Sequence, residues 1–294
     1  MLGFLGPPAD YSNLRLSPDG ARVLFSRPDE QTGNRDVWYM EASRGVGARL
    51  TTSGANDWFP HWSPDGQKIL FASDRDGGPE NQAYLKSSME PGIGEARLKD
   101  TPADSYPDDW SHDGKWMLIR KFATTGTGSD LWIVPASESE RPFAFLATPF
   151  VDAMGRFSPD DKWIAYNSTE SGRWDVYVRP FSGGPAGPTG KIRVSSNGGY
   201  FPAWSRDGKE LFFLGADLKL YSVTTQAVGR ANASPRATPL FTPCADTALS
   251  SLPLPANSYN YPYDVPPDGG RFLVNCLAVN PNRLDVMLNW RQVH

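Results

Sequence analysis

Residues 16–20 read Leu16-Ser17-Pro18-Asp19-Gly20, and variants of this pentapeptide return along the chain. The further copies are Trp62-Ser63-Pro64-Asp65-Gly66, Trp110-Ser111-His112-Asp113-Gly114, Phe157-Ser158-Pro159-Asp160-Asp161, Trp204-Ser205-Arg206-Asp207-Gly208 and the degenerate Val265-Pro266-Pro267-Asp268-Gly269. Their aspartates are 46, 48, 47, 47 and 61 residues apart. Such regular spacing indicates a repeat architecture.

Short β-rich runs follow each copy of the pentapeptide. The first copy is followed by Val23-Leu24-Phe25, then by Asp36-Val37-Trp38-Tyr39 and then by Arg49-Leu50-Thr51. Together with the strand before the turn, these runs make four strands per period, which is the content of one propeller blade. The sequence therefore predicts an all-β fold, a six-bladed β-propeller of four-stranded antiparallel blades.

The pentapeptide itself has the chemistry of a tight turn. Proline presets the first corner, aspartate bonds its own backbone, and glycine accepts a positive φ. We therefore interpret the six aspartates as turn formers and not as a row of acidic sites.

The two ends of the chain are expected to complete one blade. Leu284–Trp290 reads as a final strand, and Met1–Leu5 is predicted to pair with it, so that the ring closes through its N- and C-terminal strands. We expect one domain over residues 1–294, with Ala231–Asn257 as a surface insertion. The repeats are placed at about 10–55, 56–102, 103–150, 151–196, 197–256 and 257–294 plus 1–9.

Composition excludes several classes of function. A net charge of −4 over 294 residues provides no basic field for a phosphate backbone, so no nucleic-acid partner is expected. No apolar run approaches the roughly 18 residues of a membrane span. The opening Met1–Gly6 lacks the basic start of a secretion signal. Cys244 and Cys276 are too few for a disulfide framework, and sequence does not decide whether they are bonded.

Several longer blocks resemble the TolB-like propellers, WD40-like repeats built on Ser-Pro-Asp-Gly. The resemblance is strongest to the C-terminal propeller domains of bacterial serine/threonine protein kinases. It rests on residues 11–20, on Asp57–Gly66, Gly128–Trp132 and Trp163–Ser168, and above all on Val176–Phe181 and the terminal Leu288-Asn289-Trp290.

This resemblance implies a sensor, scaffold or interaction domain of a larger protein, facing the periplasm or the cell exterior. The implied partner is a protein, a peptide or a small molecule at the funnel face, and the implied state is a monomer. No cofactor is expected.

Enzyme motifs are missing from the sequence. There is no kinase phosphate loop, His-Arg-Asp or Asp-Phe-Gly, and no Gly-x-Ser-x-Gly. His61, His112 and His294 lack the spacing of a metal site, so no metal is predicted. We therefore expect a non-catalytic binding module. The alternative is a propeller hydrolase or lyase that uses acids at the funnel, such as Asp57, Asp109 and Asp264.

A binding surface is predicted where the chain enters the first strand of each blade, opposite the Ser-Pro-Asp-Gly turns. These segments combine aromatic rings with a few charges, which suits a ligand surface. The predicted rim comprises Tyr11, Asp57, Trp58, Phe59, His61, Tyr106, Asp109, Arg156, Tyr200, Phe201, Tyr261 and Tyr263. In contrast, Trp62, Trp110, Phe157 and Trp204 are expected to pack between blades.

Overall fold

The computed structural model describes most of the chain as β-structure. The described residues are 2–5, 10–87, 89–122, 128–137, 139–185, 190–227, 235–243, 261–266, 271–276 and 283–288; of 2–5, 227, 271, 276 and 283–288 only the backbone is described. They form two compact units, one within residues 1–107 and 259–294 and one within 108–245. Within these ranges no helix has the length and apolar character that a membrane crossing requires.

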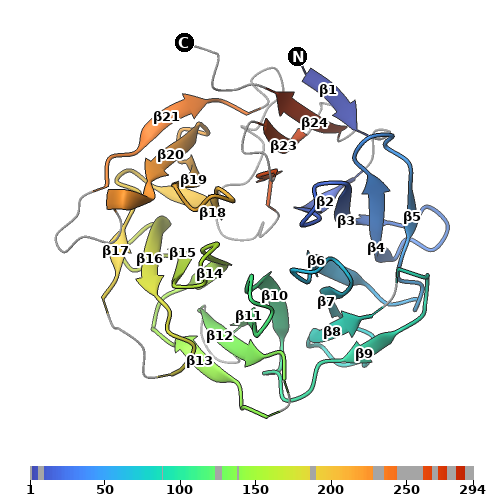
Figure 1. The fold of residues 1–294 in the computed structure, drawn as a ribbon. Coiled ribbons are helices and arrows are strands. Elements are labelled where there is room, and N and C mark those ends of the chain that lie inside the picture. Colours follow the sequence, from blue (N-terminus) through green and yellow to red (C-terminus); the bar gives the residue numbers. More distant parts are fainter. Residues whose placement is uncertain are drawn as a thin grey trace. The chain divides into compact units, whose positions relative to one another are not determined.

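Two complete blades lie in the first unit (Figure 1). Blade 1 consists of β2 (Ser12–Leu16), β3 (Arg22–Pro28), β4 (Arg35–Glu41) and β5 (Gly47–Arg49). Blade 2 consists of β6 (Asp57–Trp62), β7 (Ile69–Ser73), β8 (Gln82–Lys86) and β9 (Glu95–Arg97). In each blade consecutive strands are neighbours and antiparallel, as hairpin connections require.

Three more blades follow, and the second unit contains them apart from the start of β10. Blade 3 consists of β10 (Ser105–Trp110), β11 (Trp116–Phe122), β12 (Ser129–Pro135) and β13 (Phe143–Leu146). Blade 4 consists of β14 (Asp152–Phe157), β15 (Trp163–Ser168), β16 (Asp175–Pro180) and β17 (Ile192–Arg193). Blade 5 consists of β18 (Gly199–Trp204), β19 (Glu210–Gly215), β20 (Leu220–Thr224) and β21 (Thr238–Phe241), with the short 3-10 turn η1 (Thr225–Ala227) after β20.

The prediction of six blades was wrong. Five blades are present, and each of them is built from four strands that are consecutive in the sequence. The remaining sheet has the order β1-β24-β23-β22 and takes β1 (Leu2–Leu5) from the other end of the chain. The C-terminal part of the chain supplies the other three strands of this sheet, which are the two-residue β22 (Tyr263–Asp264), β23 (Arg271–Cys276) and β24 (Arg283–Leu288). The sixth pentapeptide has proline in place of the serine that organises the other turns.

The expected pairing of the chain ends is present in this composite sheet. β1 runs antiparallel to β24, with Leu2 opposite Met287 and Leu5 opposite Leu284. The pairing does not by itself establish a closed ring. Cys244, the side chain of Cys276 and most of the predicted insertion 231–257 lie outside the described residues.

The Ser-Pro-Asp-Gly turns are held by the hydrogen bonds that their sequence predicts. In the first copy Ser17 Oγ donates to Asp19 Oδ1 (2.5 Å) and accepts from the backbone N–H of Arg22 (2.9 Å). Gly20 has a φ of 72°, which glycine adopts without steric cost. The same serine-to-aspartate bond occurs at Ser63, Ser111, Ser158 and Ser205. The aspartates in these five turns are therefore turn formers, as predicted.

The turn of blade 5 gives the first testable prediction. The Ser205 hydroxyl, together with the Lys209 backbone N–H, lowers the pKa of Asp207 to about 2. Because this folded-state pKa lies below the ordinary value of 3.8, the ionised carboxylate stabilises the fold above about pH 4, and the contribution is lost as the pH falls toward 2.

We expect Ser205→Ala to raise the pKa of Asp207 toward 3.8 in a carboxyl-carbon NMR titration. Ser158→Ala, the equivalent change in the turn of blade 4, is the matched control and should leave Asp207 unaffected. An unchanged Asp207 pKa in the Ser205 variant would contradict this account of the turn.

The first strand of four blades contains a bulge at one equivalent position. Asn13, Phe59, Met154 and Phe201 all have φ between 52° and 58°, and the strand register shifts there. Positive φ is costly for non-glycine residues, and a bulge re-aims the side chains around it. In blade 3 the equivalent residue is Pro107, whose ring does not permit a positive φ.

Apolar side chains fill the space between neighbouring blades of a unit. The three clusters that join blades are Leu24, Val37, Leu50, Trp62, Ile69, Phe71 and Tyr84 (blades 1 and 2), Trp116, Leu118, Leu131, Ile133, Phe145, Leu146, Phe157, Ile164, Tyr166, Tyr177 and Phe181 (blades 3 and 4), and Ala165, Val176, Val178, Val194, Leu211, Phe213 and Val223 (blades 4 and 5). Trp62 and Phe157 belong to these clusters and the partly buried Trp204 packs against the third, as predicted, and Trp110 is buried.

Candidate functional site

The enzyme alternative placed the acids Asp57, Asp109 and Asp264 at the funnel. Two of these acids, Asp109 and Asp264, instead hold the next strand in place. Asp109 Oδ2 accepts from the backbone N–H of Phe157 (2.8 Å), and its Oδ1 lies 3.3 Å from Arg156 Nη1. In the first unit Asp264 Oδ2 accepts from the backbone N–H of Leu16 (2.8 Å). Both carboxylates thus link adjacent sheets.

Asp57, the third candidate acid, is engaged in an ion pair within blade 2. Its two carboxylate oxygens lie 3.0 and 3.1 Å from Arg75 Nη2, and Arg75 Nη1 also contacts Glu95 (2.5 Å). Burial raises the pKa of Asp57, and hydrogen bonding to Ser73 together with the Arg75 charge opposes that rise. The side chain is fully buried, so the pair braces the start of β6.

His61 belongs to a buried cluster with Arg15 and Tyr261 in the first unit. Arg15 Nε donates to His61 Nδ1 (3.3 Å), and the Arg15 guanidinium lies 4.0 Å from the centre of the Tyr261 ring. All three side chains are at most 4% exposed. A guanidinium stacked on a ring and bonded to an imidazole is a packed arrangement that rigidifies the first strands.

The other predicted rim residues divide into buried and half-buried groups. Tyr11, Arg156, Phe201 and Tyr263 are buried, and Trp58, Phe59, Tyr106 and Tyr200 are half-buried. Two of the half-buried rings meet, because Phe59 packs edge-on against Tyr106 with ring centres 5.5 Å apart. The structure brings together Phe59 with Tyr106, Arg156 with Asp109, Tyr200 with Phe201, and His61 with Tyr261 through Arg15. Ligand contact by any of them remains a prediction.

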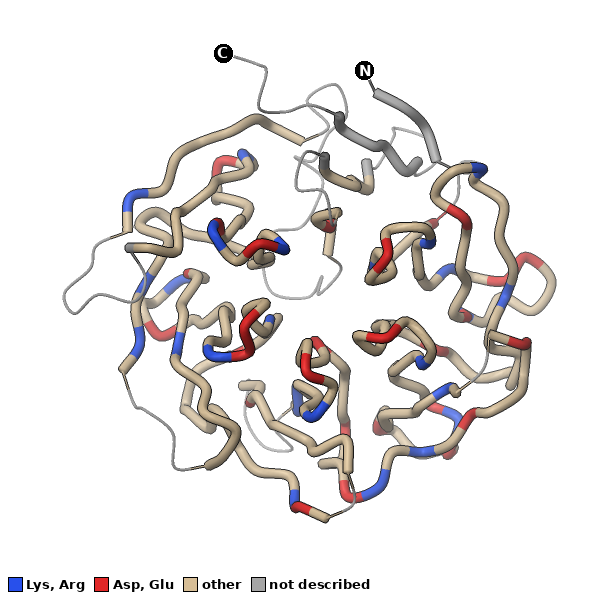
Figure 2. The backbone as a smooth tube through the Cα atoms, in the orientation of Figure 1, with Lys and Arg blue, Asp and Glu red and all other residues tan. Residues whose placement is uncertain are grey.

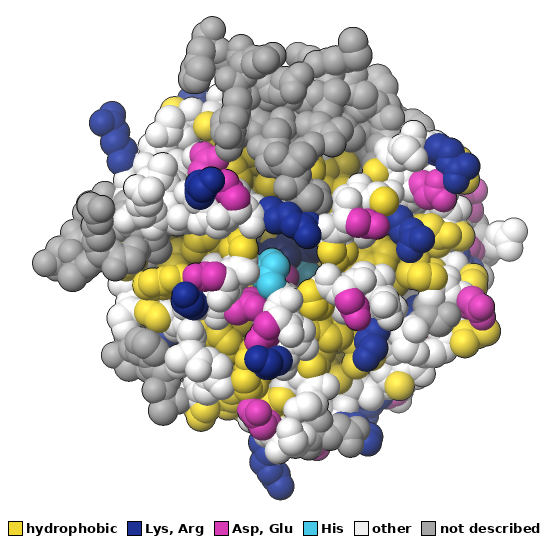
Figure 3. Space-filling view, viewed as in Figure 1, with side chains coloured by type: hydrophobic (Ala, Val, Ile, Leu, Met, Phe, Trp, Pro, Cys, Tyr) yellow, Lys and Arg dark blue, Asp and Glu magenta, His cyan; other side chains and the backbone are white. Residues whose placement is uncertain are grey.

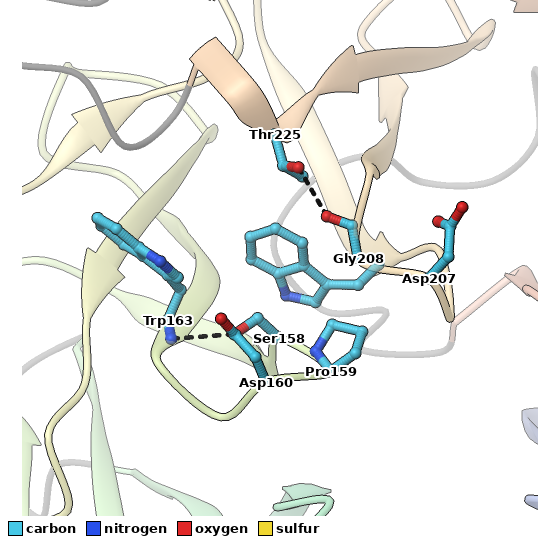
Figure 4. Close-up of a pocket in the computed structure, with 8 residues that line it drawn as sticks. Ser158, Pro159, Asp160, Trp163, Asp207, Gly208 and Thr225 are labelled. Carbon is cyan, nitrogen blue, oxygen red and sulfur yellow. Dashed lines mark hydrogen bonds between the residues drawn. The ribbon is translucent and has the colours of Figure 1, made fainter.

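A pocket opens at a place that the sequence did not indicate, beside the Ser-Pro-Asp-Gly turns of blades 4 and 5. It has a volume of about 340 Å³. The lining residues are Ser158, Pro159, Asp160, Trp163, Trp204, Asp207, Gly208 and Thr225. Figure 4 shows Trp163 and Asp160 on one side and Thr225 with Gly208 on the other. The volume lies at the lower end of the range of small-molecule sites.

Hydrogen bonds fix the walls of this pocket. Thr225 Oγ1 donates to the carbonyl oxygen of Gly208 (2.6 Å), and the backbone N–H of Trp163 donates to Ser158 Oγ (3.0 Å). Trp204 Nε1 donates to the carbonyl oxygen of Arg156 (3.1 Å), so the polar edge of this indole is used by the scaffold. The Trp204 indole is therefore held in position before any ligand arrives, and the backbone that presents Trp163 is fixed by its turn.

Charges at the pocket rim are paired within their own turns. Lys162 Nζ lies 3.9 Å from Asp160 Oδ2, and Lys209 Nζ lies 3.1 Å from Asp207 Oδ2. In Figure 2, acidic and basic residues also lie close together in other turns. Figure 3 shows apolar side chains exposed between charged side chains of both signs. The pocket is therefore an aromatic recess with a rim of balanced charge.

Comparison with known proteins agrees with the repeat and with the blades. A family model described as the TolB beta propeller domain matches residues 10–128. The solved structure of a TolB-type protein from Agrobacterium tumefaciens superimposes with a TM-score of 0.66 at 17% identity, over 96% of this chain and 91% of that chain. The chain thus has the β-propeller fold of the TolB-type structures, and its residues 10–128 match the TolB family model.

Other proteins with this propeller fold differ in function. An oligogalacturonate lyase solved in complex with manganese has a TM-score of 0.60 at 13% identity, over 98% of this chain and 93% of that chain. The uncharacterized peptidase YuxL of Bacillus subtilis is 32% identical over 123 residues, which are 40% of this chain and 18% of the relative. The chain spans less than a fifth of the length of the curated relatives that it matches.

The chain's acidic, histidine and cysteine residues were also candidates for a metal site. Among its described residues, no three or more His, Cys, Asp or Glu side chains gather closely enough to hold a metal ion. The sequence pattern did not indicate the pocket, because its two tryptophans stand at two different repeat positions. Trp163 takes the place of Arg22 in the first repeat, and Trp204 takes the place of Leu16.

Proposed function

We propose that this TolB-like propeller is a non-catalytic module that binds a peptide or protein. The observation that carries the proposal is the use of Asp57, Asp109 and Asp264, each of which is bonded to a guanidinium or a backbone N–H of its own scaffold. A catalytic acid or base must reach a substrate atom, and these carboxylates are committed to other partners. Rigid aromatic walls favour recognition of a ligand.

The competing hypothesis is a hydrolase or lyase. Two similar proteins support it. One solved structure of similar fold is an oligogalacturonate lyase, and one relative in sequence is described as a peptidase. Fold likeness at this identity does not carry activity over, because one propeller fold serves many functions.

Turnover assays test the choice between these hypotheses. We expect no turnover of oligogalacturonate with manganese, or of a proline-containing peptide, that depends on the three acids. Asp57→Asn and Asp109→Asn should lower the unfolding temperature, because each weakens an ion pair or a link between strands. Turnover by the unchanged chain that is lost in either variant, with circular dichroism and melting unchanged, would overturn the proposal.

Selection from a random peptide library tests the binding itself. The proposal predicts that the immobilised chain enriches peptides with a shared sequence, which then bind in solution with a saturable isotherm. Matched Trp58→Ala and Phe201→Ala variants report whether the predicted rim takes part. Selection that yields no consensus, repeated with the folded protein, would count against a peptide-binding role.

We also propose that the propeller acts as the sensor or interaction part of a larger protein, as the kinase-fused propellers do. The support is the resemblance in sequence and the small share of the curated relatives' length that this chain covers. An open reading frame that continues from a kinase and a membrane segment into Leu2 supports this role. A stop codon directly upstream of Met1 would contradict it.

A further inference from the structure

The pocket of blades 4 and 5 has a counterpart between blades 3 and 4. The residue after the third strand of blade 4 is Phe181, whose backbone N–H donates to the carbonyl oxygen of Lys162 (2.7 Å). In blade 5 Thr225 makes the same bond to Lys209 (2.9 Å). Since Lys162 and Lys209 both follow the turn aspartate by two residues, Phe181 and Thr225 are equivalent positions.

Phe181 fills the counterpart with its own ring. Its ring centre lies 6.0 Å from that of Trp116 and 5.4 Å from that of Phe157, in edge-to-face arrangements. Phe145 adds a third such contact at 6.1 Å. Because edge-to-face packing is the favoured arrangement of aromatic pairs, this ring completes the junction of the two blades.

Thr225 leaves the equivalent space unfilled. Trp163 corresponds to Trp116, and Trp204 corresponds to Phe157, so the aromatic walls are retained while the central ring is missing. The exposure of the walls reflects this difference. Trp116 and Phe157 are 8% and 1% exposed, whereas Trp163 and Trp204 are only partly buried.

We propose that this pocket binds an aromatic side chain of a peptide, which takes the place that Phe181 occupies in the neighbouring junction. The proposal rests on the proposed binding function and names its site and ligand class. The rim favours a neutral ring, because Asp160 and Asp207 already face Lys162 and Lys209. The ring of the ligand would lie between two indoles. Aromatic residues in such enclosed pockets are typical of binding hot spots.

N-acetyl-L-phenylalanine amide is the probe that tests this inference. Titration into the chain, followed by NMR of the Trp163 and Trp204 indole N–H signals, should show saturable binding with a Kd on the order of 1 mM, as expected for a ligand of this size. N-acetyl-L-leucine amide should bind at least tenfold more weakly. Absence of saturable shifts at these two indoles would overturn the inference.

Thr225→Phe is the decisive variant. It fills the pocket with a ring of the protein itself, as Phe181 does in the junction of blades 3 and 4. We expect a folded protein in which the probe binds at least tenfold more weakly. Thr52→Phe adds the same ring at an exposed threonine outside the pocket and should bind as the unchanged chain does. If Thr225→Phe does not fold, Trp163→Ala replaces it and should weaken binding to the same extent; probe affinity unchanged in a folded variant of either kind overturns the inference.

The outcome also separates this inference from the proposed function. Library peptides that bind the unchanged chain and the Thr225→Phe variant equally well would sustain a binding module but overturn the pocket as its site. No consensus peptide and no probe binding would overturn both.

Discussion

Asp108→Ala should lower the free energy of unfolding by about 3–5 kcal/mol, the loss typical when one partner of a buried ion pair is removed. Asp108 Oδ1 lies 3.3 Å from Arg120 Nη1, and the two side chains are 2% and 1% exposed. The other carboxylate oxygen accepts from the backbone N–H of Gly155 (3.0 Å). Removal of the side chain thus takes this negative charge away from a buried guanidinium and takes the acceptor away from the Gly155 N–H.

Urea unfolding followed by circular dichroism measures this loss. Asp108→Asn retains an oxygen for the Gly155 N–H and should cost less than the alanine variant, because only the charge is removed. Glu41→Ala removes the partner of Arg44 from an exposed pair and should cost less than about 1 kcal/mol. Equal losses for Asp108→Ala and Glu41→Ala would show that the buried pair does not brace the fold.

Phe181→Thr should cost about 3 kcal/mol of stability, because it deletes a nearly buried ring that touches three other aromatic rings. The variant reproduces between blades 3 and 4 the arrangement that Thr225 creates between blades 4 and 5. We therefore also expect a second pocket, which binds the phenylalanine probe and shifts the Trp116 indole signal.

The double variant Phe181→Thr, Thr225→Phe moves the pocket from one junction to the other. Binding should persist and be reported by Trp116 in place of Trp163. A single Phe181→Thr variant that unfolds at the same urea concentration as the unchanged chain would contradict the packing role of this ring. The reverse change at Thr225 serves as its matched control.

The turns and strands were predictable because their chemistry is local. The interval from Ser17 to Arg22 contains every group that holds the turn, so the pentapeptide alone specifies it. The number of blades was not predictable in the same way. Six copies of the turn imply six strand sets, but the sixth copy lacks the serine, and its sheet is completed by Leu2–Leu5.

The roles of Asp109 and Asp264 could not be predicted from the sequence, because they depend on contacts between different repeats. Asp109 bonds to the Phe157 N–H, 48 residues away, and Asp264 to the Leu16 N–H, 248 residues away. A carboxylate next to an aromatic residue looks the same in sequence whether it faces a substrate or a neighbouring strand. Only the register of adjacent blades distinguishes these cases.

The pocket was missed because it needs two features together, a residue smaller than Phe181 at one repeat position and the two indole walls Trp163 and Trp204. Ala42, Ala136, Phe181 and Thr225 follow the third strands of blades 1, 3, 4 and 5, and the backbone bond that each makes shows their equivalence. In the sequence these residues lie 23, 23, 21 and 18 positions after the turn aspartate, so the spacing hides the correspondence. Alignment by the backbone hydrogen bond, and not by sequence interval, reveals it.

A crystal structure of the chain with a library-selected peptide is the most direct test of a binding module with an aromatic pocket. The account predicts an aromatic side chain of the peptide between Trp163 and Trp204, edge-on to at least one indole, with Thr225 beside it. A peptide bound only at another surface would contradict the assigned site. A cleaved peptide bound beside Asp57 or Asp109 would contradict the non-catalytic function itself.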